Sequence, residues 1–136
     1  MLSEATSGLN VAAGRRRSWI VIDGASSDQT VARVREAEDL APQVISEPDE
    51  GIADAWNKGV ARARGEHVLI LNAGDVYDPD FLEVMAQHAD GRRIICSHAR
   101  LAKEDGREVG MFLAQPDKLA RAMHVPHNWC AVPSRH

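Results

Sequence analysis

The chain has 136 residues, a formal net charge of −4 and 44% hydrophobic residues. This length predicts one domain over residues 1–136 with a real core, and the acidic balance gives no sign of a nucleic-acid-binding surface. No apolar run approaches the roughly 18 residues of a membrane-spanning helix, and the N-terminal residues lack the apolar core of a signal peptide. We therefore expect a cytoplasmic protein. The basic run at 15–17 predicts a solvated patch, with a peripheral contact at the inner face of a membrane as the alternative.

The first distinctive segment begins with a short apolar strand. Residues 18–22 read SWIVI without polar alternation, as expected of a strand that is covered on both faces. The sequence DGASSD follows at 23–28 and places Asp23 at the carboxyl end of that strand. Asp28 is placed to cap a helix that we predict over 29–40.

A second strand and a turn lead into another helix. The strand is predicted at 43–46, and the turn EPDEG occupies 47–51. In the helix that follows, Asp54 and Asn57 stand three residues apart and therefore share one face. Gly65 marks the end of this helical segment.

A third strand ends near a lone carboxylate. It is predicted at 66–71 and continues into NAGD at 72–75. Open α/β sheets bind ligands at the carboxyl ends of their strands. Asp75 is therefore placed where a metal-bound phosphate would be held.

The remaining sequence continues the alternation of strands and helices. A helix with Asp78 as its cap and Pro79 at its first position is predicted next, and a hairpin turn is predicted at 103–106. Further strands are predicted at 92–97, 107–113 and 128–132, and a last helix at 116–123. This order predicts an α/β domain with a mainly parallel sheet and helices on both faces. Cys96 and Cys130 lack metal-ligand spacing and are predicted to be buried thiols.

Three blocks of sequence together resemble the family 2 glycosyltransferases, an inverting class with the GT-A fold. The blocks are VIDGASSDQT at 21–30, SEPDEGI with DAWNKG at 46–59, and LNAGD at 71–75. Their order and spacing match that family, and weaker similarity extends the resemblance over residues 18–135. The resemblance implies transfer of a sugar from a UDP- or GDP-type nucleotide-sugar to a hydroxyl acceptor, such as a glycan or a lipid-linked saccharide, with inversion.

The resemblance also implies roles for particular residues. Asp23 resembles the carboxylate that contacts the base of the nucleotide; the competing interpretation is a turn aspartate that caps local amides. Asp75 resembles the last acid of the metal-binding Asp-X-Asp motif and would hold Mg²⁺ or Mn²⁺ against the donor diphosphate, while Asp78 is expected to cap a helix instead. His127 resembles a histidine on the acceptor side. The other members of the implied donor pocket are Ser26, Asp49, Gly51, Asp54, Asn57 and Asn72.

Plain structural duties compete with several of these roles. Asp54 and Asn57 equally fit a solvent-facing polar side of their helix. Lys58 fits a solvated side chain, and Trp56 fits the core. Ser26 fits cap or turn duty better than nucleophilic catalysis.

The family pattern is longer than this sequence, so we expect a domain that is short at both ends. Either residues 1–11 replace the family's central first strand, which we favour, or the strands at 18–22 and 66–71 pair directly. If neither happens, we expect the chain not to fold stably alone. The family's catalytic base lies beyond the position of His127; we find no candidate there and leave the catalytic residue unassigned. The alternative to an enzyme is a non-catalytic remnant that binds a nucleotide weakly or acts through a protein partner. A nucleotidyltransferase or a Rossmann dehydrogenase fits less well, because the glycine-rich loop of either class is not found.

Overall fold

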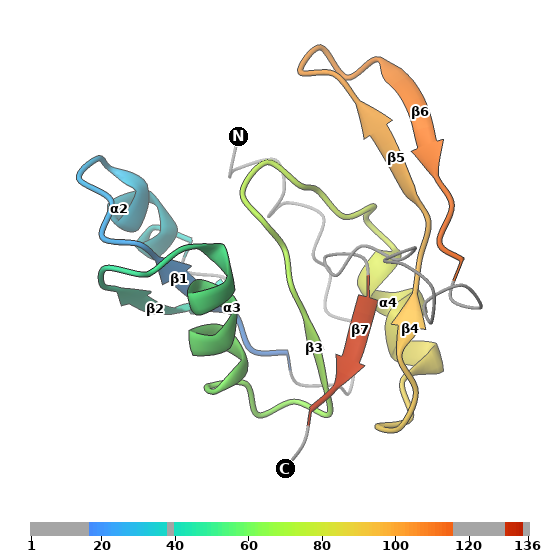
Figure 1. Ribbon diagram of the computed structural model, residues 1–136, viewed down its shortest axis with the longest axis horizontal. Helices are drawn as coiled ribbons and strands as arrows, with labels where there is room; N and C mark the ends of the chain where they lie inside the picture. The colour runs from blue at the N-terminus through green and yellow to red at the C-terminus, as the bar shows by residue number, and fades with distance from the viewer. Residues whose placement is uncertain (1–16, 38–39, 116–129, 135–136) are drawn as a thin grey trace.

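The computed structural model describes residues 17–37, 40–115 and 130–134, and these fall into two halves (Figure 1). The amino-terminal half comprises 17–37 and 40–64, and the carboxy-terminal half comprises 65–115 and 130–134. In chain order the elements are β1 (Ile20–Asp23), α2 (Thr30–Arg35), β2 (Gln43–Ser46), α3 (Ile52–Val60), β3 (His67–Leu69), α4 (Phe81–His88), β4 (Ile95–Cys96), β5 (Ala99–Ala102), β6 (Glu108–Phe112) and β7 (Cys130–Pro133).

The amino-terminal half is built on a parallel pair of strands. β1 pairs with β2 from Ile20 opposite Gln43 to Asp23 opposite Ser46, and α2 lies in the connection between them, as a parallel crossover requires. The Oδ1 atom of Asp28 accepts a hydrogen bond of 2.9 Å from the amide of Thr30, the first residue of α2. Because the strands are parallel, their carboxyl ends lie at the same edge.

Helix α3 packs closely against β1. A Cβ atom added to Gly59 would lie 3.6 Å from Cγ1 of Ile22, an ordinary van der Waals distance, so this part of the helix lies directly against the strand. On the other strand, α2 contacts β2 and contributes the buried Val34. These contacts fix where the carboxyl edge of β1 and β2 lies relative to the start of α3.

The carboxy-terminal half is built around β7. This strand lies between β3 and β4 and is antiparallel to both, with Ala131 opposite Leu69 on one side and Ile95 on the other. Ala131 is 2% exposed, and the other buried apolar residues of this half are Met85 and Cys130. The central strand of this sheet therefore comes from a distant part of the chain.

A two-stranded hairpin extends away from this sheet (Figure 1). β5 and β6 pair antiparallel, and the amide of Gly106 donates a hydrogen bond of 2.9 Å to the carbonyl of Lys103 in the turn. Gly106 has a φ of +80°, a conformation that glycine adopts without strain. The hairpin predicted around 103–106 is confirmed.

The α/β class is confirmed, but the strand pairing is mixed. β1 and β2 are parallel, whereas the three other described pairings are antiparallel. Of the described pairings, only β1 with β2 has the parallel arrangement that we expected for most of the sheet. The strand predicted at 43–46 is confirmed, whereas the one predicted at 92–97 shrinks to β4. It shrinks because Asp90 Oδ1 accepts the amides of Arg92 and Arg93, which holds this stretch in a turn.

Other expectations are corrected or fall outside the described residues. The strands predicted at 18–22 and 66–71 do not pair directly, because β1 and β3 belong to different sheets. α4 begins at Phe81, two residues after Pro79, so Pro79 is not its first residue. The segments at 1–11 and 116–123, and His127, lie outside the described residues. Within the described part of the chain, no helix is long and apolar enough to cross a membrane.

Candidate functional site

Asp23 lies at the carboxyl end of β1 and is buried, with 6% of its surface exposed. Its Oδ2 atom accepts a hydrogen bond of 2.6 Å from the hydroxyl of Ser46, at the end of β2, and one of 3.0 Å from the amide of Ser26. The hydrogen bonds from Ser26 and then Ser46 lower the pKa of Asp23 below its ordinary value. The parallel edge therefore holds an oriented carboxylate that stays ionised at neutral pH.

Asp49 lies in the turn after β2, close to Gly24. Its Oδ1 atom accepts a hydrogen bond of 2.9 Å from the amide of Gly51. Its Oδ2 atom would be 2.6 Å from a Cβ atom added to Gly24, the residue after Asp23. Gly24 thus leaves room for Asp49 to approach the end of β1. Gly51 has φ +117° and ψ 178°, a region that only glycine adopts readily, so it fixes the entry into α3.

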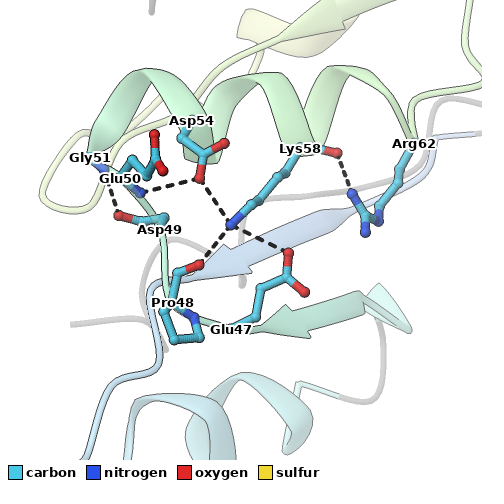
Figure 2. Close-up of polar contacts among 8 residues, drawn as sticks. All are labelled: Glu47, Pro48, Asp49, Glu50, Gly51, Asp54, Lys58 and Arg62. Atoms are coloured by element: carbon cyan, nitrogen blue, oxygen red, sulfur yellow. Dashed lines mark hydrogen bonds and ion pairs between the residues drawn. The ribbon is translucent and has the colours of Figure 1, made fainter.

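Lys58 is the centre of a polar network that ties α3 to this turn (Figure 2). Its Nζ atom lies 3.0 Å from Oδ2 of Asp54 and 3.3 Å from Oε1 of Glu47, and it donates a hydrogen bond of 2.8 Å to the carbonyl of Pro48. The amide of Glu50 donates to Oδ2 of Asp54 at 3.2 Å. The network holds the turn against the first turn of the helix.

The expectation of a solvated Lys58 is therefore wrong. Its side chain is 19% exposed, because the turn folds back over the helix. The hydrogen bond with Lys58, and then the one from the amide of Glu50, lowers the pKa of Asp54, and the hydrogen bond with Asp54 raises the pKa of Lys58. The Asp54 carboxylate is engaged in holding the loop, while Asn57 lies exposed on α3. Donor contacts by Asp54 and Asn57 stay predictions.

A side-chain hydrogen bond joins α3 to the loop after β3. Nε1 of Trp56, on α3, donates to Oδ1 of Asn72 at 3.2 Å. In that loop the amide of Asp75 donates to the carbonyl of Asn72 at 3.1 Å, and Gly74 between them has a φ of +93°. Trp56 is thus not merely a core residue. It sets the position of the NAGD turn relative to α3.

Tyr77 supports the same loop from the other side. Its hydroxyl donates to the carbonyl of Ile70 at 3.0 Å, and its ring stacks on Phe81 with centroids 4.2 Å apart. Burial raises the pKa of Tyr77 to about 12, with smaller contributions from the charges of Asp75 and Cys130. The Asp75 carboxylate is half-buried and lies near this phenol, which stays protonated.

The side chains near Asp75 would bind a cation only together with a ligand that supplies further oxygen atoms. Among residues 17–37, 40–115 and 130–134, no three His, Cys, Asp or Glu side chains gather as a metal site would. The Asp75 carboxylate is a hard oxygen donor of the kind that Mg²⁺ and Mn²⁺ prefer. The Asn72 oxygen already accepts from Trp56. A diphosphate would have to supply further oxygens.

Asp78 does not act as the helix cap that we expected. Its carboxylate pairs with Arg100 on β5, and no side chain caps α4. The expected helix-capping role of Asp78 is therefore wrong. At the start of α4, the amide of Phe81 instead donates a hydrogen bond to the backbone carbonyl of Asp78.

The fold brings most of the expected residues into one continuous region. Asp23, Ser26, Asp49 and Gly51 meet at the carboxyl edge of β1 and β2, which we call the polar rim. The Trp56–Asn72 bond links this rim to the loop of Asp75. Sequence reasoning missed Ser46, Trp56 and Lys58 as positioning residues. A hydroxyl at the end of the partner strand was the available signal for Ser46.

Comparisons with known proteins identify the family of this chain. The family model described as glycosyl transferase family 2 matches residues 10–128. The chain therefore belongs to glycosyl transferase family 2. No solved structure matches it significantly.

Curated relatives are bacterial proteins. The chain is 32% identical over 96 residues to the succinoglycan biosynthesis protein ExoO of Rhizobium meliloti (strain 1021), which covers 68% of this chain and 28% of that protein. It is 27% identical over 100 residues to the putative glycosyltransferase EpsH of Bacillus subtilis (strain 168), which covers 71% of this chain and 29% of that protein. The chain thus spans less than a third of the length of these two relatives.

Proposed function

We propose that this chain binds the nucleotide part of a nucleotide-sugar and serves as the donor-binding portion of a hexosyltransferase. The carrying observation is the edge where β1 and β2 end together, with the ionised Asp23 held by Ser26 and Ser46. An oriented carboxylate accepts hydrogen bonds from N–H or O–H groups, which the base and ribose of a nucleotide offer. The donor would be of the UDP or GDP type.

We assign the diphosphate to the loop of Asn72 and Asp75. The Trp56–Asn72 bond keeps this loop against α3, next to the turn that carries Asp49 and Gly51. Asp75 would hold Mg²⁺ or Mn²⁺ together with phosphate oxygens. Bound there, the cation would offset the charge that develops on the departing nucleoside diphosphate.

The reaction would be an inverting transfer to a hydroxyl group of a glycan or lipid-linked saccharide. The acceptor oxygen attacks the anomeric carbon in line while a base takes its proton. We assign no described residue as that base, and the acceptor-side role of His127 rests on the resemblance alone. The name of the relative ExoO favours a polysaccharide as the product.

Calorimetry with UDP and GDP tests the donor site. Asp23→Asn should weaken binding about tenfold to a hundredfold, because a hydrogen bond to a charged acceptor contributes about 1.5–3 kcal/mol. Glu104→Gln, which removes an exposed carboxylate from the hairpin turn, is the matched control and should bind as wild type. Equal affinities of the wild type and Asp23→Asn would contradict the assignment, as would wild type that binds neither nucleotide.

The same titration separates the metal role of Asp75. With Mn²⁺ present, Asp75→Asn should bind UDP more weakly than wild type, and with a chelator the two should bind alike. Circular dichroism checks that both variants are folded. If the affinities with Mn²⁺ are equal, Asp75 does not hold the cation.

A further inference from the structure

Two cysteine side chains face each other across the carboxy-terminal sheet. Cys96 on β4 and Cys130 on β7 are direct partners in the antiparallel register. Both are thiols, and their Sγ atoms lie 3.1 Å apart. Direct antiparallel partners have Cα atoms about 4.5–5.5 Å apart, which falls within the range of about 4.4–6.8 Å that a disulfide spans. The two strands are thus already placed for a bond between the sulfur atoms.

The two thiols differ in access. Cys130 is 6% exposed, and burial, followed by the contact with Cys96, raises its pKa to about 12. Cys96 is half-buried at the outer strand of the sheet. A soluble reagent therefore reaches Cys96 more readily than Cys130. This is the arrangement of an attacking thiol with a second thiol that resolves the intermediate.

We propose that Cys96 and Cys130 are a modification site that forms an intramolecular disulfide by exchange with a low-molecular-weight disulfide. The Cys96 thiolate attacks one sulfur of that disulfide, forms a mixed disulfide and releases one small thiol. Cys130 then loses its proton, attacks the Cys96 sulfur and displaces the second small thiol. Two protein S–H bonds are replaced by one S–S bond, and the two protons and two electrons leave on the two small thiols.

The bond would lie beside the loop of Asp75. β7 pairs with β3 on its other side, and β3 leads directly into that loop. Cys130 lies close enough to Tyr77 for their ionisations to interact, and the hydroxyl of Tyr77 donates to the carbonyl of Ile70. Oxidation would fasten β7 to β4 and close a covalent loop between residues 96 and 130. A loop of this length restricts the unfolded chain, which stabilises the folded sheet.

The experiment incubates the full chain with oxidised glutathione under native conditions and, in parallel, in concentrated urea. After an acid quench and alkylation, intact mass separates the intramolecular disulfide, which lacks two hydrogen atoms, from glutathione adducts. We expect the equilibrium constant for the intramolecular bond to be at least about tenfold larger in the native chain than in urea, because the fold holds the thiols together. The oxidised chain should melt roughly 10 °C higher than the reduced chain.

Two variants complete the test. Cys130→Ala should stop at a glutathione adduct on Cys96, and Cys96→Ser should react slowly because its remaining thiol is buried. A native chain that forms the bond no more readily than the urea-unfolded chain would overturn the proposal. So would wild type that accumulates only glutathione adducts or covalent dimers.

Discussion

The two halves of the molecule organise their strands in different ways. In the amino-terminal half, the paired strands β1 and β2 are separated by 19 residues of sequence, from 24 to 42, and one helix. In the carboxy-terminal half, the central strand β7 follows β3 by 60 residues, from 70 to 129. Contacts between close neighbours can be predicted from local pattern, whereas long-range pairing depends on which surfaces meet.

The halves also differ in surface. The large apolar side chains that are exposed number two in the amino-terminal half, Ile52 and Val60, and nine in the carboxy-terminal half. Several of the nine lie on the hairpin, among them Val109 and Met111, which are 54% and 59% exposed. Within the described residues, the polar rim therefore belongs to the half that exposes fewer large apolar side chains.

The largest effect is expected when a charged residue is introduced at the centre of β7, which tests whether the two halves differ in stability. Ala131→Asp places an unpaired carboxylate at a position that is 2% exposed and should cost about 3–5 kcal/mol of unfolding free energy. Urea denaturation measures the loss. Hydrogen exchange should show that amides of β3, β4 and β7 lose more protection than those of β1 and β2.

Val132→Asp is the matched control for that variant. Val132 is the next residue of the same strand and is 43% exposed, so the same charge should cost less than about 1 kcal/mol there. Equal loss of protection in both halves of Ala131→Asp would mean that the two halves unfold as one cooperative unit.

A smaller effect is expected at the entry into α3. Gly51→Ala forces a side chain into φ +117°, ψ 178°, which should cost about 1–3 kcal/mol and weaken nucleotide binding by displacing Asp49. Gly110→Ala is the control, because its added Cβ would lie an ordinary 3.8 Å from Leu101 Cδ1. Wild-type stability in Gly51→Ala would show that the turn tolerates another conformation.

The smallest effect concerns acid sensitivity, and both halves share it, because hydrogen bonds from the amides of Arg92 and Arg93 also hold the pKa of Asp90 well below its ordinary value. Hydrogen bonds lower the pKa of Asp23, Asp28 and Asp54 in the amino-terminal half below the ordinary 3.8. A lowered folded-state pKa contributes stability above about pH 3.8, and that stability is lost as the pH falls through the folded-state value. The stability that these three carboxylates contribute should therefore decrease in acid, below about pH 3.8.

Asp54→Asn tests this pH dependence. The variant should be slightly less stable than wild type at neutral pH, and the gap should narrow as the pH falls through the folded-state pKa of Asp54, because the protonated wild-type carboxyl no longer binds Lys58 as an anion. Asp80→Asn, at an exposed carboxylate before α4, is the control and should have the stability of wild type at neutral pH. Urea midpoints across this range measure both. A constant gap between Asp54→Asn and wild type at all pH values would contradict the assignment.

The sequence by itself determined the features that local chemistry controls. The apolar run before Asp23 predicted β1, and the strand at 43–46 was predicted to the residue. The same pattern placed Asp23 at the carboxyl end of a strand, whereas Asp49 was predicted from the family resemblance. The family was likewise evident from three short blocks whose residues are near one another in the chain.

Tertiary structure alone decided the contacts between distant residues. It made Lys58 the centre of a network instead of a solvated side chain, bonded Trp56 to Asn72, and paired Asp78 with Arg100 instead of leaving it as a cap. It also brought Cys96 against Cys130. Hydrophobic periodicity encodes which face of an element is buried, but it does not encode which partner covers that face. Packing of the whole chain makes that choice.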